Sequence, residues 1–559
     1  MVKRLINILN KEISGLHEAA YLLGFFAILS QVLALVRDRF LAYYFGPGQV
    51  LDIYYAGFRI PDFIFAIFAS IVSISVLVPF LTDKFCRSKE EGKEFIDNIF
   101  SFFFISIVAF SLLAFFVMPY IIPWVFPGFT DQTQIDKIVA VSRIMLLSPI
   151  LLGLSNLLGS ITQVFRRFVI YSISPLFYNI GIIIGIIFFY PIFGVYGLAL
   201  GVVLGAIAHL GIQVPFVSSQ RLLPKVKVKI NYSFVKEVIT ISIPRTITLA
   251  SSQLSIIILL SMASILGIGS ISVFNLSFNL QSVPLSIIGV SYSIAAFPTL
   301  AKLFSAGEKE NFLKEVIISA RHIIFLSLPI IVLFIVLRAQ IVRTVLGAGQ
   351  FDWTDTRLTA AALALFTVSV LFQSLNLLLI RAYYAAGDTI RPLLANCLSA
   401  VLGVVFSLIL VKMYAANSLF HYFIESLLRV ENIANTSVLM LPLGYSLGMF
   451  IGGIWLIISF DKRYKGLLGG IVPVFFQSFS AAVITGFVAY LGLNIFDDIF
   501  NLETLIGIFG QGLASGLLGL TAWVVTLKLL KSRELRDVWT TLHHKIWKAK
   551  PIPVEVSEL

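Results

Sequence analysis

The sequence predicts an all-α polytopic membrane protein with 14 transmembrane helices, because of its composition, its long apolar segments and the distribution of its charges. Hydrophobic residues make up 58% of the 559 residues, charged residues only 13%, and the mean hydropathy is +0.96. A soluble protein of this size would have about a quarter charged residues. The composition therefore excludes a disordered chain, a fibrous repeat and an ordinary soluble enzyme.

The apolar segments set the number of predicted spans. A helix needs about 20 apolar residues to cross a bilayer. Glycines, prolines and charge clusters divide the chain into segments of this length. The fourteen predicted spans lie near 18–45, 53–82, 95–126, 136–165, 168–191, 194–218, 237–267, 271–301, 314–346, 357–386, 389–414, 436–460, 467–494 and 503–529.

The basic residues support this count independently. Segments predicted to face the cytoplasm, including both ends of the chain, contain 30 of the 41 Lys and Arg, whereas the opposite side contains four. One miscounted helix would reverse every later loop and remove the asymmetry. We therefore expect both termini in the cytoplasm. The net charge of +12 follows from this topology and does not indicate nucleic acid.

The two halves of the chain resemble each other. Pro175 precedes Asn179 by four residues, and Pro392 precedes Asn396 in the same way, each after an Asn-Leu-Leu sequence and a basic loop. Six spans separate the copies, so the repeats run parallel and predict two six-helix lobes around a central cavity. The expected domains are an amphipathic cytoplasmic N-terminus 1–17, an N-lobe 18–218, a basic linker 219–236, a C-lobe 237–460, two further helices 461–529 and a basic cytoplasmic tail 530–559.

Polar residues recur at helical spacing in the first, second, seventh and eighth predicted spans. A charge inside a membrane is costly, so each one marks a candidate site. We expect a hydrophilic cavity lined by these spans, with Asp38 and Asp52 as partners of Arg37 and Arg59. Hydrogen bonds between packed helices are an alternative for the eighth span, and a structural ion pair is an alternative for Arg37 and Asp38. The candidate substrate-binding residues are Gln31, Arg37, Asp38, Asp52, Arg59, Arg245, Asn279 and Ser282.

Sequence signals of enzymatic chemistry are missing. The chain has no phosphate-binding loop ending in Gly-Lys-Ser/Thr and no serine in a nucleophile elbow. Its six histidines lack metal-ligand spacing, and Cys86 and Cys397 are far apart. We therefore expect no catalytic residues, no metal and no cofactor. A transporter or flippase is the leading interpretation, and a membrane scaffold is the second.

Several short motifs occur along the chain in a specific order and spacing. They are Ser30–Asp38, Phe45-Gly46-Pro47-Gly48, Asp52, Phe58-Arg59-Ile60-Pro61, Phe126-Pro127-Gly128-Phe129, Pro244-Arg245 with Gln253, Phe297-Pro298-Thr299-Leu300, Gly349-Gln350-Phe351-Asp352 and Arg381-Ala382-Tyr383-Tyr384-Ala385. Together these motifs resemble the MurJ/MviN family of the multidrug/oligosaccharidyl-lipid/polysaccharide (MOP) exporter superfamily, over roughly 18–530.

The resemblance implies a flippase that moves lipid II, the undecaprenyl-pyrophosphate-linked peptidoglycan precursor, across the bacterial inner membrane by alternating access. It implies that Arg37 contacts the pyrophosphate and that the helices in 461–529 form a groove for the polyprenyl tail. The implied partners are the lipid substrate, membrane lipids and cell-wall synthesis proteins.

The chain departs from the family pattern in its predicted cavity. Gln31 and Phe65 stand where the family has arginines, and Asn279 and Ser282 replace an expected arginine and glutamate. Each charge-assisted contact to phosphate contributes about 1.5–3 kcal/mol, so these losses weaken anion binding unless another arginine compensates. Arg59, Arg245 and Arg143 are the candidates. A flippase for another polyprenyl-linked glycan and a non-transporting scaffold or regulator of cell-wall synthesis are therefore alternative functions.

Overall fold

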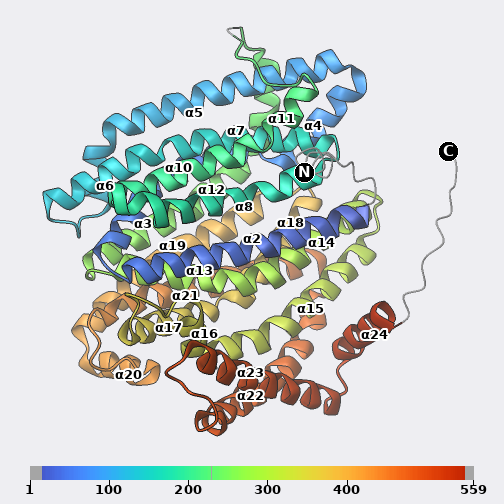
Figure 1. Ribbon diagram of the computed structural model, residues 1–559. Coiled ribbons are helices and arrows are strands. Elements are labelled where there is room, and N and C mark those ends of the chain that lie inside the picture. The colour runs from blue at the N-terminus through green and yellow to red at the C-terminus, as the bar shows by residue number, and fades with distance from the viewer. Residues whose placement is uncertain (1–15, 228, 548–559) are drawn as a thin grey trace. The chain divides into compact units, whose positions relative to one another are not determined.

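The computed structural model describes residues 16–227 and 229–547, and within these ranges the chain forms helices and no β-strand (Figure 1). The predicted all-α fold is confirmed. The predicted amphipathic N-terminus lies almost wholly outside the described residues, as does the end of the tail, 548–559.

The described chain divides into two compact units. The first contains the described residues of Met1–Val283, Val342–Phe366 and Asp388–Gly452, and the second contains those of Pro284–Ile341, Thr367–Gly387 and Gly453–Leu559. The first unit thus holds the whole predicted N-lobe and part of the predicted C-lobe. The boundaries of the two lobes stay a prediction.

The first unit is built from long helices joined by short turns. Its helices up to the unit boundary are α2 (Leu16–Phe45), α3 (Gln49–Ile71), α4 (Ile74–Arg87), α5 (Lys89–Val125), α6 (Gln132–Met145), α7 (Leu147–Val164), α8 (Phe168–Ile184), the π-helix η1 (Gly185–Phe189), α9 (Tyr190–Phe193), α10 (Val195–Gly211), α11 (Val214–Ser219), α12 (Tyr232–Ile265) and α13 (Ser270–Pro284). Later in the chain it gains α17 (Trp353–Thr367), α19 (Ile390–Ala416), α20 (Ser418–Leu428), the 3-10 helix η3 (Thr436–Leu439) and the first half of α21 (Met440–Tyr464).

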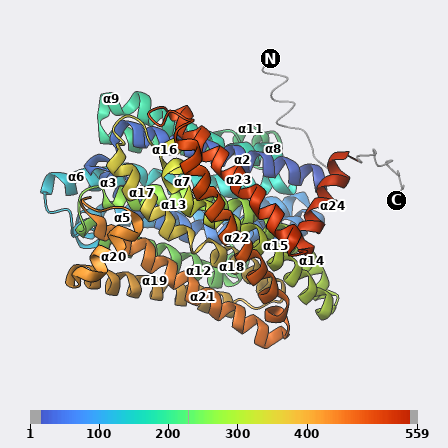
Figure 2. The same ribbon diagram turned by 90° about the horizontal axis from the view of Figure 1, so that it is seen from below.

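The second unit centres on three helices that pack side by side, α15 (Lys309–Val336), α22 (Leu467–Asp497) and α23 (Leu505–Leu529) (Figure 1 and Figure 2). Phe325 of α15 packs against Trp523 of α23, with ring centroids 4.7 Å apart. The other helices of this unit are the π-helix η2 (Leu285–Val290), α14 (Ser291–Ser305), the first half of α16 (Arg338–Val345), α18 (Val370–Ala385), the second half of α21 and α24 (Arg533–Trp547).

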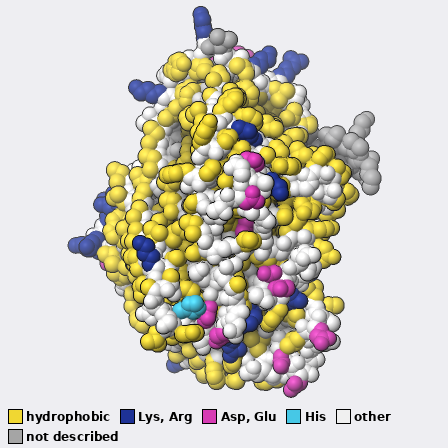
Figure 3. Space-filling view, turned by 90° about the vertical axis from the view of Figure 1, so that its left-hand side faces the viewer, with side chains coloured by type: hydrophobic (Ala, Val, Ile, Leu, Met, Phe, Trp, Pro, Cys, Tyr) yellow, Lys and Arg dark blue, Asp and Glu magenta, His cyan; other side chains and the backbone are white. Residues whose placement is uncertain are grey.

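Most of the helices can cross a membrane. Among the described residues, twelve helices are long and apolar enough to cross a membrane, when a continuous run such as α3–α4 is counted as one helix. The pair α17 and α18 is bent by 41° at its break and adds a thirteenth if it forms one span. The remaining predicted span corresponds to α2, which has 30 residues but is not among the twelve. A helix thus occupies each of the 14 predicted positions, and 12 or 13 count as spans. Hydrophobic side chains accordingly cover most of the face in Figure 3.

Small residues let two helix pairs of the first unit approach closely. A Cβ added to Gly181 of α8 would lie 2.3 Å from the Cα of Gly205 on α10. A Cβ added to Gly185, the first residue of η1, would lie 2.5 Å from the Cα of Gly201, also on α10. On α21, a Cβ at Gly448 would lie 2.4 Å from the backbone nitrogen of Gly403 on α19. Such backbone contact stabilises helix pairs in membranes. We call these two contacts the glycine seams; they join spans that are equivalent in the predicted repeat.

Candidate functional site

Arg37 and Asp38 lie near the end of α2, where this helix packs along α8 (Figure 1). The Nε and Nη2 atoms of Arg37 donate hydrogen bonds to Oδ1 of Asp38 at 3.0 and 2.8 Å. Nη1 of Arg37 donates to Oδ1 of Asn179 on α8 at 3.1 Å, and Nδ2 of Asn279 on α13 donates to Oδ2 of Asp38 at 3.0 Å. The predicted ion pair is therefore present. The Arg37 side chain stays 20% exposed.

Arg59 of α3 points to the same helix, α13, because its Nη2 atom donates to Oδ1 of Asn275. Its Nε atom is buried and has no hydrogen-bond partner in the described chain, and the same holds for the hydroxyl of Tyr55. Buried polar atoms in native proteins are nearly always paired, so each exception requires an explanation. Two such atoms one helical turn apart mark a place where a polar ligand or water can bind.

Asp62 follows Arg59 by one turn of α3 and was not among the predicted site residues. Its half-buried carboxylate interacts electrostatically with Arg59 and Arg37, yet it has no hydrogen bond or ion pair within the described residues. The spacing of Tyr55, Arg59 and Asp62 already places them on one helical face. Asn179 and Asn275 were also missed, although both occur in the polar patterns of their spans.

We call this group the arginine cluster. It consists of two guanidinium groups, two carboxylates and three amides, contributed by α2, α3, α8 and α13 of the first unit. Tyr54 and Tyr55 of α3 lie near both arginines. The members are Arg37, Asp38, Arg59, Asp62, Asn179, Asn275 and Asn279.

Asp52 has a different role from the one predicted. Its carboxylate accepts hydrogen bonds from the backbone N–H of Gly269 at 2.6 Å and of Ser272 at 2.8 Å, and from the Ser272 hydroxyl at 2.6 Å. It therefore caps the N-terminus of α13, where unpaired N–H groups favour a negative charge. The predicted partnership between Asp52 and Arg59 does not occur, because sequence spacing along α3 could not reveal the start of another helix in front of Asp52.

Three further candidates lie outside the arginine cluster. Arg245 of α12 donates to the hydroxyl of Ser73 at 3.3 Å, at the break between α3 and α4. Ser282 donates to the backbone carbonyl of Asn279 in its own helix at 2.6 Å. Gln31 is half-buried on α2 and makes no hydrogen bond within the described residues. The structure thus brings four of the eight candidates together, namely Arg37, Asp38, Arg59 and Asn279.

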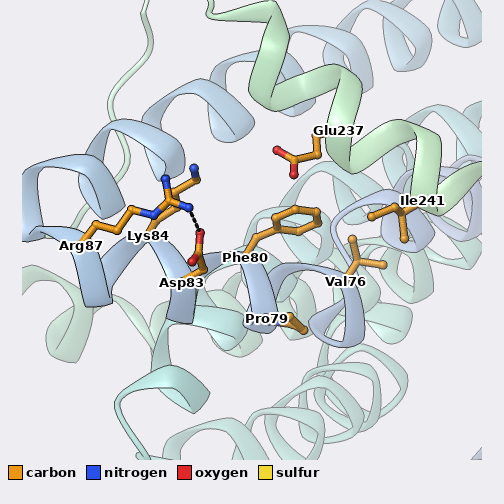
Figure 4. A pocket seen from close by; sticks show the side chains of 8 residues that line it. All are labelled: Val76, Pro79, Phe80, Asp83, Lys84, Arg87, Glu237 and Ile241. Carbon is orange, nitrogen blue, oxygen red and sulfur yellow. Dashed lines mark ion pairs between the residues drawn. The ribbon is translucent and has the colours of Figure 1, made fainter. Parts of the chain in front are cut away.

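A separate pocket of about 380 Å³ lies between α4 and α12 of the first unit (Figure 4). Arg87 pairs there with Asp83 at 3.0 Å, and Lys84 pairs with Glu91 at 3.1 Å, so carboxylates already neutralise both cations. This pocket contains none of the predicted residues. It is lined by Val76, Pro79, Phe80, Asp83, Lys84, Arg87, Glu237 and Ile241.

The arginine cluster contains two guanidinium groups and two carboxylates, and the guanidinium groups are its candidate anion contacts. Guanidinium groups present planar pairs of donors that match carboxylate and phosphate oxygens, and they stay charged inside a membrane protein. The described residues contain no group of three or more His, Cys, Asp or Glu side chains that could hold a metal ion.

Comparison with known proteins supports a transporter fold. A solved lipid II flippase MurJ in an inward closed conformation matches 93% of this chain and 100% of its own, with a TM-score of 0.73 and 21% identity. An inward-facing multidrug resistance MATE family transporter of the MOP superfamily matches 79% of this chain and 96% of its own, with a TM-score of 0.61 and 14% identity. At these identities the matches establish the fold alone.

Curated relatives define the family. The probable lipid II flippase MurJ of Thermotoga maritima is 27% identical over 507 residues, which is 88% of this chain and 98% of that protein. The probable lipid II flippase MurJ of Rickettsia prowazekii is 26% identical over 401 residues, 71% of this chain and 78% of that protein. The family model "Lipid II flippase MurJ" matches residues 41–421, well over half of the sequence. This multi-pass membrane protein therefore belongs to the lipid II flippase MurJ family.

Proposed function

We propose that this protein is a flippase that moves lipid II across the bacterial inner membrane by alternating access, and that the arginine cluster holds the pyrophosphate during the transfer. The family supports the substrate. The observation that carries the site is the pair of arginines on α2 and α3, one of them with a buried Nε that lacks a partner in the described chain.

Arg37 and Arg59 would contribute to pyrophosphate binding in different ways. Asp38 holds the Arg37 guanidinium through two hydrogen bonds, so this cation is oriented before the substrate arrives. Arg59 has one amide partner and an Nε that nothing in the described chain engages, so it has more donor capacity for an incoming phosphate oxygen. A cation that is held in place loses little freedom on binding, which strengthens the contact.

Asn279 contributes a neutral donor where the family pattern has an arginine. Its Nδ2 atom is engaged by Asp38, so it fixes the carboxylate and leaves the contact with phosphate to the arginines. The cluster thus compensates for the lost family charges with Arg59, whereas Arg245 donates to Ser73 at the α3–α4 break. This assignment explains how anion binding persists without the expected pair at 279 and 282.

The polyprenyl tail would lie along α22 and α23 of the second unit, outside the polar interior. These helices expose large apolar side chains, including Phe476 and Phe487 at 63% each and Val525 at 57%. Their own contact is made by small residues, since Gly519 packs on Ala489. An apolar surface of this kind suits an isoprenoid chain that stays in the lipid while the head group moves.

The remaining topology follows from the same proposal. Two lobes of six helices, 18–218 and 237–460, would alternate their opening around the head group, as in other transporters with repeated bundles. Both termini would lie in the cytoplasm, because the basic loops gather on that side. Proteins of cell-wall synthesis would be partners in supplying or consuming the substrate.

Native mass spectrometry of the purified protein tests this function. Lipid II, undecaprenyl phosphate and phosphatidylglycerol compete at equal concentration for the wild type, for Arg37→Ala and for Arg39→Ala. Arg39 is a matched control, because it lies two residues away on α2 but donates to the backbone carbonyls of Thr344 and Val345. Thermal unfolding of each variant establishes that it is folded.

We expect the wild type and Arg39→Ala to retain lipid II selectively and Arg37→Ala to lose that selectivity. Equal loss in both variants would remove Arg37 from the site. Preference for a different polyprenyl-pyrophosphate glycan would keep the site and change the substrate. Absence of any preference over phosphatidylglycerol would favour the scaffold alternative.

A further inference from the structure

The short helix α20 has an exposed face of large apolar side chains, unlike a helix whose outer face lies in water. It begins two residues after α19 ends, in the segment that connects two spans of the first unit. Four large apolar side chains point away from the protein: Leu419 is 81% exposed, Tyr422 70%, Phe423 60% and Leu427 61%. The spacing of these residues places them on one helical face.

The opposite face of α20 is buried and contains a carboxylate, Glu425, between the apolar residues Ile424 and Leu428. Glu425 is only 7% exposed, and its Oε1 atom accepts hydrogen bonds from the hydroxyl of Thr436 at 2.8 Å and of Tyr414 at 3.2 Å. His421 lies 3.0 Å from the same oxygen, and its ring stacks on Tyr414 with centroids 4.4 Å apart. A carboxylate that is satisfied by the protein, beneath an outward apolar face, indicates that the surroundings of α20 are not water.

The apolar face of α20 continues the lipid-facing surface of α19. That helix is one of the apolar spans, and only 22% of its most hydrophobic window is buried. Lys412, near its end, is long enough to extend its ammonium group to the lipid head groups. Lipid therefore covers both α20 and the row of exposed apolar side chains on α19 that leads toward it. This row consists of Val401, Val405, Leu408, Ile409 and Met413.

We propose that α20 is an interfacial helix whose outward face lies in the lipid of one membrane leaflet, at the boundary between acyl chains and head groups. Helices that lie in this plane bury their apolar side by several ångströms, and tyrosine is favoured at this depth. α20 lies on the same side of the membrane as the α12–α13 turn. The contact that shows this is between Asn435, just before η3, and Ile268 in that turn, whose carbonyl accepts a hydrogen bond from the Asn435 side chain at 3.1 Å. This side is opposite the basic loops, so the leaflet is the external one.

The Glu425 network sets the orientation of α20. Three groups from α19, α20 and η3 meet at one carboxylate oxygen, and the Asn417 side chain caps the start of the helix by accepting from the N–H of Phe420 at 3.1 Å. These contacts fix the rotation of the helix about its axis. The four apolar side chains therefore point to the bilayer and cannot turn inward.

Spin labelling tests this proposal on the full-length protein in lipid nanodiscs. The chain has only two cysteines, Cys86 and Cys397, so replacing both by serine gives a background for single nitroxide labels. Ser426→Cys and Phe423→Cys each place a label on the outward side of α20. Leu408→Cys on α19 serves as the lipid reference, and Lys309→Cys, at an exposed position in a basic loop, serves as the water reference.

The measured quantity is the ratio of nitroxide collision with oxygen, which partitions into lipid, to collision with a water-soluble nickel chelate. We expect both α20 labels to give ratios near that of the label at 408 and several-fold above that of the label at 309. Ratios equal to that at 309 would place α20 in water and overturn the proposal. Spin–spin broadening with two copies per disc but not with one would assign the face to a second copy of the chain, which would also overturn it.

A variant of the network gives an independent readout. Glu425→Ala removes the shared acceptor and should raise the mobility of the label at 426, because the rotation of α20 is no longer fixed. Glu425→Gln keeps an oxygen acceptor and should preserve most of the immobilisation. Equal mobility in the wild type and in Glu425→Ala would show that the network does not orient the helix.

Discussion

Two groups of buried charge face α13 from neighbouring positions, and they differ in how completely the protein satisfies them. At Asp52, three donors of Gly269 and Ser272 saturate the carboxylate. In the arginine cluster, the Nε of Arg59 and the hydroxyl of Tyr55 have no partner in the described chain. A saturated buried charge holds two helices together, whereas an unsaturated one is available to a ligand. Whether the polar atoms of a buried group have hydrogen-bond partners therefore distinguishes the structural residue Asp52 from the candidate substrate-binding residues.

The largest expected effect is on the saturated site. Asp52→Ala leaves two N–H groups and one hydroxyl without their acceptor, and we expect it to lower the free energy of unfolding by about 3 kcal/mol or more. Thermal unfolding in detergent measures this loss. Asp62→Asn is the matched control, because Asp62 has no hydrogen bond within the described residues and only an electrostatic interaction is lost, so its unfolding temperature should fall much less. Equal destabilisation by both variants would remove the distinction between the two sites.

The next effect concerns the unsaturated site. Arg59→Ala removes a charge-assisted contact to the pyrophosphate, and we expect it to weaken lipid II binding by about 1.5–3 kcal/mol, or roughly 10- to 150-fold in Kd. Asn275→Ala, which removes only the amide partner of Arg59, should weaken binding much less. Titration with lipid II in nanodiscs compares the two variants. If Asn275→Ala has the larger effect, Arg59 positions the helix and does not bind substrate.

A smaller effect of opposite sign is expected at Asp62. Its carboxylate interacts with both arginines, so it competes with an incoming anion for them. Asp62→Asn should therefore tighten pyrophosphate binding, by roughly tenfold at the effective dielectric constant of partly buried sites. The same titration measures the change. Weaker binding in this variant would show that Asp62 contributes to the substrate site in another way.

The smallest effect is expected at Ser282, which sequence reasoning placed in the site. Its hydroxyl donates to the carbonyl of Asn279 in its own helix, so Ser282→Ala should change both binding and stability by less than about 0.5 kcal/mol. Stability and lipid titrations of this variant therefore give a baseline for the others. A clear loss of binding would return Ser282 to the substrate site.

The fold was largely predictable from the sequence, because hydropathy and basic loops depend only on the chain and the membrane. Both report on single helices, so they located a helix at each predicted position. The site was predictable only in part. Periodicity placed Arg37, Asp38 and Arg59 on polar faces, but it cannot tell which helix stands opposite each face. Asp52 was therefore assigned to an arginine, although the start of α13 lies in front of it.

Other misses have the same physical origin. Asp62 shared the periodicity of Arg59, yet it was left out because nothing in a single helix shows whether a carboxylate has a partner. Likewise, nothing in the sequence shows that Arg39 donates to the carbonyls of Thr344 and Val345 at the end of α16, more than 300 residues away in the chain. Contacts of this kind depend on tertiary packing and leave no local pattern in the sequence.

The glycine seams have a consequence for the order of assembly during synthesis. α8 and α10 are separated only by η1 and α9, so their seam can close as a helical hairpin as soon as residue 211 has entered the membrane. α19 and α21 are separated by α20 and η3, so their seam can form only after this longer connection has been synthesised and has folded. Contact between glycines costs no side-chain rotamer entropy, which favours early pairing. The first pair can thus form during translation, and the second pair should form late, with the final helices.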